Sequence, residues 1–423
     1  MKKLFAPAIA LALVLFSLFG CSAARGGNSY FIQLSVNPSS FYIEGERISD
    51  AEYSDLMQDL SDLLEGLEDK FSVGIESSDI SRINAAKAGE QIAVSDDTFT
   101  LLSLCGRYYE LSDGKFSPAL FPLSELWGFS PDRAGHYNDA RPEPSQEKIL
   151  SALSVSDWNA YTFGGGNTVT KSDSGAKLDL GGIAKGYMAD AVASYISDRY
   201  AGKRVDAIVS AMSSNMVLLG QAHAAGGMRE YNIGIENPRA ALAEELEDGT
   251  PLINDPALYM VGLSDVSVTT SADNYRFYIE NGKIYSHIID GTTGKPAENG
   301  IISVTVVVPQ EVPHSGAFAD ALSTAGFCMP LRQAVSFFEG LSQTYGVGAV
   351  IITADHKYYA LGSLNVMSAK EFVLYSNEHY GTSENAEMYA DVFERGDLSA
   401  LPDEVQNCDR ETEYIEYMSS LLG

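Results

Sequence analysis

The sequence predicts an α+β fold in which mixed sheets pack with helices. Of its 423 residues, 45% are hydrophobic and 20% are charged, which is typical of globular rather than disordered proteins. Helix-like and strand-like segments follow one another without the regular alternation of a doubly wound parallel sheet. The clearest local signal is Asn281-Gly282 between two β-rich runs, which predicts a hairpin with a type I′ turn.

The other elements follow from periodicity and capping signals. Leucines recur three to four residues apart through 51–71, with acidic residues between them, which predicts an amphipathic helix. Ser95 and the two aspartates after it predict the start of a second helix that ends near Gly114. Further helices are predicted at 184–195 and 318–329, and strands at 205–219 (interrupted at 213–215), 275–280, 283–289, 301–308 and 347–353.

The first residues have the pattern of a secretory signal. Met1–Lys3 is basic, and no charged residue occurs in 4–20. The stretch ends at Leu18–Cys21, which resembles the lipobox of bacterial lipoproteins. That resemblance implies cleavage before Cys21, a lipid on its thiol, and attachment to the extracytoplasmic face of the cell membrane. Plain secretion and an uncleaved anchor are the alternatives.

The end of the chain differs from the rest. From Glu371 onward acidic residues far outnumber basic ones, and the apolar residues have no sustained period. We expect an extension with one or two short helices, either solvated or docked on the main body. Cys105 and Cys328 lie in apolar runs and are expected to be buried, because four cysteines in a chain of this length do not make a disulfide framework.

The net charge limits the possible ligands. Lys and Arg number 28 against 57 Asp and Glu, a formal charge of −29. Such a field repels phosphate backbones, so nucleic-acid binding is not expected. An anionic ligand would need local neutralisation by a cation or by N–H groups that point toward it.

A candidate metal site lies in the predicted helix 318–329. Asp320 and Thr324 are four residues apart, so their oxygens share one helix face. A carboxylate beside a hydroxyl suits a hard cation such as Mg²⁺. The alternative is an ordinary helix face on which Thr324 bonds its own backbone.

Glycines precede the predicted helix at 184–195. In the run 179–187, Gly181 and Gly182 would let the backbone approach a ligand, and the helix start would point N–H groups toward it. Lys185 adds a positive charge, so a diphosphate would fit. The alternative is a structural turn in which Asp179 caps the helix, and the spacing matches neither a Walker A motif nor a dinucleotide fingerprint.

His287 is the candidate base. It ends the second hairpin strand, just before a polar turn, where an imidazole can accept a proton near neutral pH. The alternative is a histidine bonded to neighbouring backbone. The other histidines show no metal-ligand spacing.

Taken together, these runs resemble the ApbE family of FAD:protein FMN transferases. The resemblance covers residues 44–368 and implies an ApbE-like α+β fold with one catalytic unit. The runs that carry it, in order, are 77–84, 114–119 with 126–129, 178–187, 231–238, 270–271, 287–294 and 319–324. The implied organisation is a signal peptide (1–20), a tether and N-terminal segment (21–43), the transferase domain (44–368) and an acidic C-terminal extension (369–423).

The resemblance also implies a reaction and its residues. FAD is the substrate, Mg²⁺ helps to break its diphosphate, FMN passes to a Ser or Thr hydroxyl of an exported flavoprotein, and AMP leaves. His287 matches the base. Residues that match metal ligands are Gly182, through its carbonyl, Asp320 and Thr324. Residues that match positions lining the flavin nucleotide are Ser117, Pro118, Ala119, Asp179, Lys185 and Ile289.

Several positions depart from the family pattern. Ser213-Ser214 stand where two glycines are usual, Ala272 stands where one glycine is usual, and 28–42 has no Met-Gly-Thr run. The aromatic residue with which the family often covers the nucleotide near 71–74 is missing. Ser323 stands where some members have a third carboxylate. These departures predict a looser hold on FAD. They leave open an FAD pyrophosphatase that yields FMN and AMP, a non-catalytic flavin-binding lipoprotein, and a surface solute-binding protein without flavin.

Overall fold

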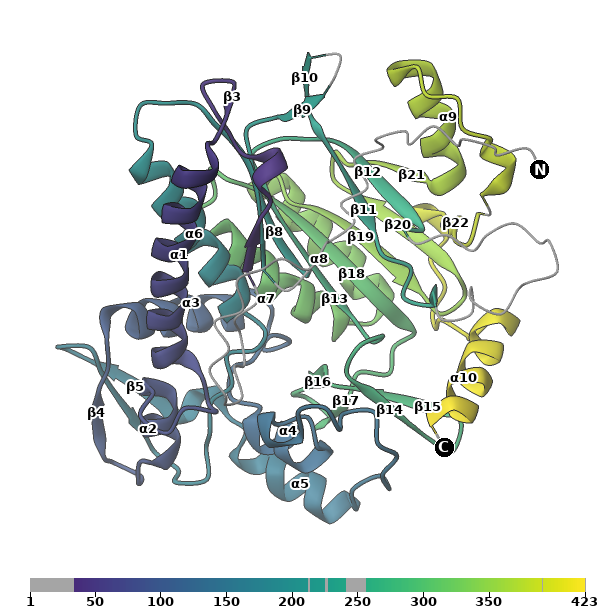
Figure 1. The fold of residues 1–423 in the computed structure, drawn as a ribbon. Helices are drawn as coiled ribbons and strands as arrows, with labels where there is room; N and C mark the ends of the chain where they lie inside the picture. The colour runs from purple at the N-terminus through teal and green to yellow at the C-terminus, as the bar shows by residue number, and fades with distance from the viewer. Residues whose placement is uncertain (1–33, 212–213, 225–226, 241–255, 390, 423) are drawn as a thin grey trace, which may run out of the picture.

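The computed structural model describes residues 34–211, 214–224, 227–240, 256–389 and 391–422. The expected signal peptide, Cys21 and the first part of the expected tether lie outside these residues. The fold is α+β, as the sequence predicts (Figure 1). Among the described helices, none has both the length and the apolar composition needed to cross a bilayer.

The helices and strands alternate irregularly along the chain. The α-helices are α1 (Asp50–Phe71), α2 (Asp79–Ala85), α3 (Asp96–Leu111), α4 (Phe121–Trp127), α5 (Gln146–Val155), α6 (Ala184–Arg199), α7 (Ser315–Phe327), α8 (Leu331–Tyr345), α9 (Ala369–Tyr380) and α10 (Asp409–Leu422). Short 3-10 helices occur at Pro38–Ser40, Pro131–Arg133, Trp158–Ala160, Ala386–Met388 and Leu398–Ala400.

One large sheet dominates the molecule. Its strands run in the order β22-β20-β19-β18-β13-β8-β7-β2-β3, and β1 also pairs with β7. These strands are β1 (Leu34–Val36), β2 (Tyr42–Ile43), β3 (Glu46–Arg47), β7 (Val205–Ala211), β8 (Asn215–Leu219), β13 (Val266–Ala272), β18 (Ile301–Pro309), β19 (Gly348–Thr353), β20 (Lys357–Leu361) and β22 (Glu394–Arg395).

Smaller sheets surround the large one. Two have three strands, in the orders β11-β12-β21 and β4-β6-β5, and the rest are two-stranded. The strands are β4 (Gln91–Ala93), β5 (Tyr161–Gly164), β6 (Thr168–Lys171), β9 (Ala222–Ala224), β10 (Gly227–Arg229), β11 (Tyr231–Ile235), β12 (Leu258–Leu263), β14 (Phe277–Glu280), β15 (Lys283–Ser286), β16 (Ile289–Asp290), β17 (Lys295–Pro296) and β21 (Asn365–Ser368).

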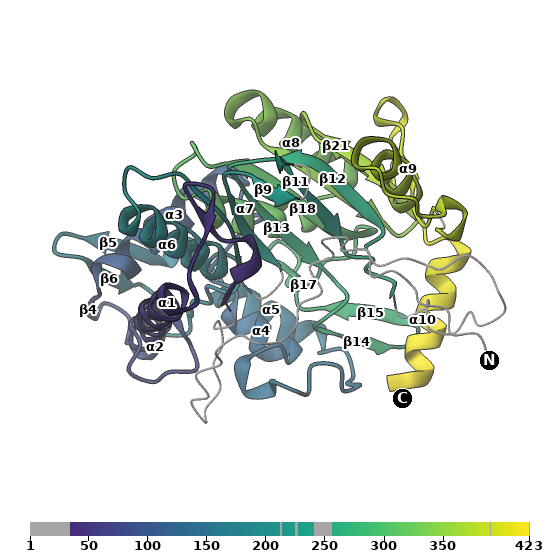
Figure 2. The ribbon, with the colours of Figure 1, turned by 45° about the horizontal axis from the view of Figure 1, so that its top comes forward.

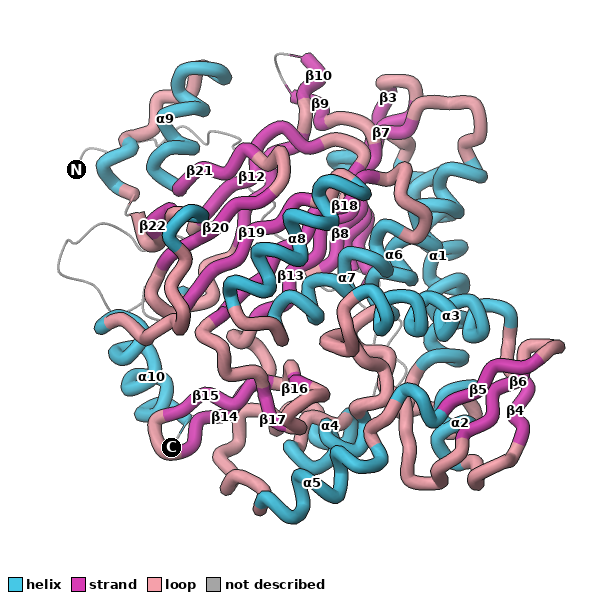
Figure 3. The backbone as a smooth tube through the Cα atoms, turned by 180° about the vertical axis from the view of Figure 1, so that it is seen from behind, coloured by secondary structure: helices cyan, strands magenta, loops and turns pink. Residues whose placement is uncertain are grey.

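The core has two layers, one on each face of the large sheet. Helices α6, α7 and α8 cover one face (Figure 3). The three-stranded sheet β11-β12-β21 covers the other. Along β19, Ala349 and Ile351 face the helical layer, whereas Val350 and Ile352 face the small sheet. Because both faces are buried, the central strands are continuous apolar runs rather than alternating ones.

The predicted elements are largely confirmed. The amphipathic run becomes α1, and Ser49 accepts the Glu52 N–H to cap it. In the hairpin β14–β15, Asn281 and Gly282 have φ of 53° and 71°, as a type I′ turn requires. Cys105 and Cys328 are buried free thiols.

The acidic C-terminal segment is docked, which decides between the two arrangements left open by the sequence. In α9, the Phe372 ring stacks on Tyr259 of β12 at 3.9 Å between centroids. Strand β22 extends the edge of the large sheet beside β20. Helix α10 lies along the β14–β15 hairpin (Figure 2). The expectation of a largely solvated segment is therefore wrong for these parts of 369–422.

Candidate active site

Two helices with little side-chain volume between them form the frame of the site. A Cβ at Gly186 of α6 would overlap the carbonyl oxygen of Gly316 of α7. Asp190 of α6 accepts the N–H groups of Gly316 and Ala317, at 2.7 and 2.9 Å. It thereby caps α7, for which His314 at the N-cap supplies no side-chain bond. Burial raises the pKa of Asp190 to about 7, although these N–H groups act against the rise.

Asp320 lies where the two helices meet. It is 2% exposed, and its Oδ2 accepts the Gly186 N–H at 3.0 Å. Lys185 Nζ lies 3.6 Å from Asp320 Oδ1 and donates to the Gly181 carbonyl at 2.6 Å. Burial raises the pKa of Asp320 above its usual range, although Lys185 and the Gly186 N–H act against this. The carboxyl is therefore in a site that would gain from a further positive charge.

The remaining expected metal ligands are beside it. Thr324 Oγ1 donates to the Asp320 carbonyl at 3.2 Å, so the alternative of a backbone-bonded threonine is also satisfied. A Cβ at Gly182 would lie 3.2 Å from Thr324 Oγ1, so the Gly182 backbone adjoins this hydroxyl. Gly182, Asp320 and Thr324 are thus brought together from two distant segments. The three candidate metal ligands therefore lie close together although they are far apart in the sequence.

The donor set fits a hard cation. A carboxylate, a hydroxyl and a backbone carbonyl are all oxygen donors, the type that Mg²⁺ takes. No group of three or more His, Cys, Asp or Glu side chains with metal-ligand placement occurs among the described residues. The protein ligands would therefore leave coordination positions for water and phosphate oxygens, as is usual for Mg²⁺ beside a phosphorylated substrate.

The expected nucleotide-lining segments adjoin one another. The Asp179 N–H donates to the Pro118 carbonyl at 2.8 Å, and Asp179 Oδ1 accepts the Gly181 N–H at 2.9 Å. Ser117 Oγ accepts the Ala119 N–H at 3.3 Å. Segments 117–119 and 179–181 therefore form one backbone unit beside the helix start, and Asp179 caps the turn rather than α6 itself.

A second pair of motif runs is joined through Asn84. Its side chain accepts the Leu178 N–H at 2.6 Å and donates to the Leu178 carbonyl at 2.9 Å. The run 77–84, which includes most of α2, thus fixes the chain that enters the glycine-rich turn. Lys115 and Asp290 join the runs 114–119 and 287–294 through an ion pair at 3.0 Å.

His287 follows β15 and is held by its backbone. Its N–H donates to the Arg276 carbonyl at 2.9 Å, and its ring contacts Phe129 edge-on. Among the described groups, no partner bonds its buried Nδ1 atom. Burial lowers the pKa of His287 to about 3, and the charges of Arg276 and Lys185 act in the same direction. The imidazole is therefore neutral at physiological pH, but with this pKa it is a weaker base than the near-neutral one expected from the sequence.

Ile289 lies two residues beyond the histidine and is buried in the small sheet β16–β17. Its carbonyl faces the Cys328 thiol, which donates to it at 3.7 Å. Ile289 is therefore held against the end of α7, while its backbone pairs with Pro296.

Further residues surround the metal candidates. Asn215 is 1% exposed, hydrogen-bonds to Asp320 and acts to lower the pKa of that carboxyl. Ser271 Oγ lies 2.8 Å from Ser323 Oγ and 3.5 Å from Thr324 Oγ1. The sequence contained a signal for Asn215, because 213–215 interrupts an apolar strand pair. It gave none for the hydroxyl contacts, which depend on the pairing of β13 with its neighbours.

The structure shows the surroundings of three residues that depart from the family pattern. Ser214 accepts the Thr270 N–H at 2.9 Å and so continues the strand pairing, while Ser213 lies outside the described residues. Ala272 is the last residue of the extended strand β13, where no glycine conformation is required. Ser323 is fully buried and bonds the Asp320 carbonyl at 2.9 Å, so it supports the site as a neutral donor.

Two hollows of about 440 and 320 Å³ lie elsewhere. The larger one is between α3, α7 and α8, and the smaller one is beside α9. Neither is lined by any site residue predicted from the sequence.

Comparison with known proteins gives a consistent result. The model of the ApbE family matches residues 30–351. An FAD:protein FMN transferase of Treponema pallidum is 30% identical over 321 residues, which cover 73% of this chain and 80% of that protein. The enzyme of that name from Vibrio cholerae is 30% identical over 339 residues, with 78% and 89% covered.

Solved structures agree. The flavin transferase ApbE from Vibrio cholerae superposes with a TM-score of 0.60 at 26% identity, covering 78% of this chain and 98% of that one. The ApbE protein from Thermotoga maritima gives a TM-score of 0.59 at 26% identity, covering 81% and 99%.

Proposed function

The chain belongs to the ApbE family and is a transferase, and from this premise we propose that it is a Mg²⁺-dependent FAD:protein FMN transferase. The reaction would break the diphosphate bond of FAD. A new bond would join the FMN phosphorus to a Ser or Thr hydroxyl oxygen of an exported flavoprotein, and AMP would leave. The observation that carries the proposal is the meeting of Gly182, Asp320 and Thr324 beside Lys185.

Each residue has a proposed role that suits its surroundings. Asp320, Thr324 and the Gly182 carbonyl would hold the metal. Mg²⁺ would neutralise charge that develops on the diphosphate. Lys185 would add a positive charge beside the phosphates, which an acidic protein otherwise repels. His287, neutral and with an unpartnered ring nitrogen, would accept the proton of the acceptor hydroxyl.

The segment containing Ser117, Pro118 and Ala119, together with Asp179, would line the nucleotide. Its mutual hydrogen bonds make it a rigid surface before any ligand arrives. Ile289 would contribute an apolar contact from the adjoining strand. Rigid positioning of this kind is the main contribution a protein makes to phosphoryl transfer.

We also propose where the enzyme acts. The basic start, the uncharged stretch 4–20 and Cys21 support a lipid-anchored protein on the extracytoplasmic face of the cell membrane. An exported acceptor is then the chemically accessible partner. Metabolic labelling with a fatty-acid analogue tests this placement, because label should be lost in Cys21→Ala.

Mass spectrometry of a reconstituted mixture tests the activity. The protein, FAD, Mg²⁺ and a candidate exported flavoprotein should give an FMN-sized mass gain on a Ser or Thr peptide, with an equal amount of AMP. His287→Ala should form both products about 10²-fold more slowly. AMP without FMN on the acceptor would instead indicate FAD hydrolysis, and intact FAD on a yellow protein would indicate binding alone.

A further inference from the structure

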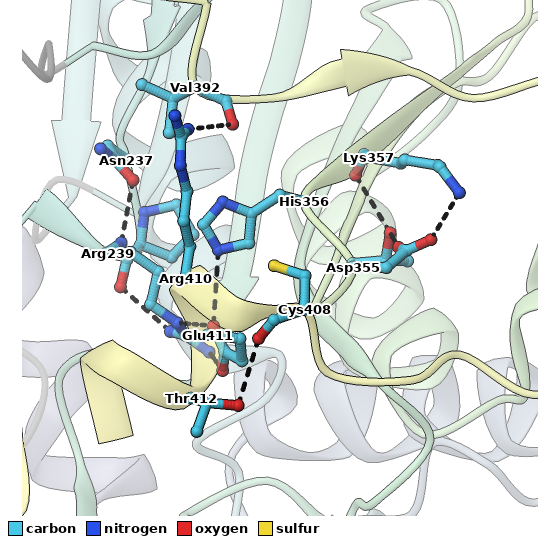
Figure 4. Close-up of polar contacts among 12 residues, drawn as sticks. Asn237, Arg239, Asp355, His356, Lys357, Val392, Cys408, Arg410, Glu411 and Thr412 are labelled. Carbon is cyan, nitrogen blue, oxygen red and sulfur yellow. Dashed lines mark hydrogen bonds and ion pairs between the residues drawn. The ribbon is translucent and has the colours of Figure 1, made fainter. Parts of the chain in front are cut away.

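The C-terminal helix α10 lies beyond the stretch that the family model matches, yet it reaches a buried charge cluster. Arg239, which follows β11, is 2% exposed. Its guanidinium donates to both carboxylate oxygens of Asp273 at 2.7 and 2.9 Å. It also donates to both carboxylate oxygens of Glu411 on α10, each at 2.7 Å (Figure 4). Bidentate pairs of this kind fix orientation as well as distance.

The cluster is closed by neighbours on several elements. His356 Nε2 lies 3.7 Å from Glu411 Oε2, and the Tyr414 ring lies 4.5 Å from the guanidinium carbon. The Arg239 N–H is accepted by Asn237 Oδ1 at 2.9 Å. Burial acts to raise the pKa of Glu411, but Arg239 and His356 together outweigh it and hold that pKa below its usual range. Glu411 is therefore ionised and pairs with Arg239 in a region that is almost completely buried from solvent.

An apolar contact accompanies the charges. Tyr414 and Ile415 of α10 pack on Phe277 and Ile279 of β14, and all four side chains are buried. Helix α10 thus holds the hairpin β14–β15 by packing on β14. It also holds the chain before the hairpin, because Glu411 and Asp273 bind the same guanidinium of Arg239. Figures 1 and 2 both show this helix alongside the hairpin.

The chain at Asp273 and the hairpin β14–β15 both border the proposed active site. Asp273 comes two residues after Ser271, whose hydroxyl contacts those of Ser323 and Thr324. The hairpin ends at Ser286, directly before His287. The His287 N–H is bonded to the carbonyl of Arg276, which lies between Asp273 and β14. The connection 273–276 therefore joins the metal candidates to the candidate base.

We propose that Glu411 is a positioning residue for FMN transfer. It acts through Arg239 and Asp273 and through the packing of α10 on the hairpin. These contacts hold His287 at a fixed position relative to the candidate metal-binding residues. This inference rests on the proposed function. It assigns the C-terminal segment a part in the reaction without any contact to substrate.

Substitutions in the otherwise intact chain test this role. Glu411→Gln keeps the side-chain shape but cannot accept from both guanidinium nitrogens, so the grip should loosen. Because small misplacements of reacting groups are costly, we expect kcat to fall roughly 10- to 100-fold. KM for FAD should stay within about twofold, because 117–119 and 179–182 are not part of the grip. Glu413→Gln, on the exposed side of the same helix, is the matched control.

Amide hydrogen exchange supplies a readout independent of activity. Exchange over 273–289 should be faster in Glu411→Gln than in the parent chain or the control, at a temperature where all remain folded. Ile415→Ala, which loosens the same packing without changing a charge, should act in the same direction. If Glu411→Gln kept the parental kcat, or lost kcat and FAD affinity together, the positioning role would be overturned. If the parent chain itself failed to transfer FMN, the proposed function would fail instead, and the exchange data would still report on the grip.

Discussion

Two cations in this molecule, the buried Arg239 and the partly buried Lys185, have very different surroundings. Arg239 meets two carboxylates through four hydrogen bonds of 2.7 to 2.9 Å. Lys185 reaches one carboxylate, Asp320, at 3.6 Å, and its short bond goes to the Gly181 carbonyl. Hydroxyl groups of Ser271, Ser323 and Thr324 complete the second region.

The difference separates a structural cluster from a ligand site. Around Arg239 the hydrogen bonds are satisfied, because the guanidinium donates four short bonds to the carboxylate oxygens of Asp273 and Glu411. Removal of one partner should therefore mainly disorder the packing around the cluster. Around Asp320, by contrast, the carboxylate is buried, the ammonium of Lys185 is 3.6 Å away, and hydroxyl oxygens lie close by, so the region would gain from an added cation. A region that gains from an added cation is suited to metal and phosphate. The following substitutions test this contrast.

The largest effect is expected at Asp320. Asp320→Asn keeps an acceptor for the Gly186 N–H but removes the ligand charge, so the fold should persist. Loss of metal-assisted charge stabilisation should lower the transfer rate about 10³-fold or more. FMN transfer at saturating FAD, with calorimetric titration of Mg²⁺, measures both effects. Unchanged Mg²⁺ affinity would remove Asp320 from the metal site.

His287 should give the next effect. His287→Ala should slow transfer about 10²-fold while FAD still binds. Because burial, Arg276 and Lys185 lower the pKa of His287 to about 3, its base form is present throughout pH 5 to 8. The kcat/KM of the parent enzyme should therefore show no loss near pH 6.5 from imidazole protonation. A limb at that pH, measured in a series of constant ionic strength, would contradict a buried neutral base.

Asp190 should affect stability rather than chemistry. Asp190→Asn leaves one of the Gly316 and Ala317 N–H groups without an acceptor, at a cost of about 1 kcal/mol. The folded pKa of about 7 lies above the unfolded value, so Asp190 contributes stability at low pH that is lost as pH rises from about 4 to 7. Urea unfolding at pH 5 and pH 8 should therefore show a smaller pH dependence in the variant. An equal dependence in both proteins would assign it to other groups.

An exposed ion pair gives the smallest effect. Lys295 and Glu143 are 2.9 Å apart, with side chains 36% and 37% exposed. Lys295→Ala should change the free energy of unfolding by no more than about 0.5 kcal/mol, since solvent and salt screen the pair. A loss of unfolding free energy several times larger, measured by urea unfolding, would contradict the expectation that exposed ion pairs contribute little to stability.

Local patterns predicted much of the fold. The capping signal at Ser95, the leucine period in α1 and the Asn281-Gly282 turn all act within one element, so their outcomes followed from sequence. Docking of α10 could not be predicted in this way. It depends on Glu411 meeting Arg239, which lies 172 residues away, and composition alone indicated only an acidic segment.

The site was predictable in its residue types but not in its supports. Asp320 and Thr324 were suggested by their helix spacing, and Gly182 by resemblance to a family. The Asp190 cap and the Ser271 contact bring together side chains from elements that are not adjacent in sequence. Burial is also a tertiary property, so the low pKa of His287 had no counterpart in its local pattern.

The contact of Gly186 with Gly316 limits how this protein can be altered. The spacing of α6 and α7 depends on two absent side chains, since a Cβ at either position would overlap backbone of the other helix. Even alanine there would force the helices apart and carry Asp320 away from Lys185. Engineering for new flavin analogues could therefore vary the walls of the site broadly, provided that both glycines are kept.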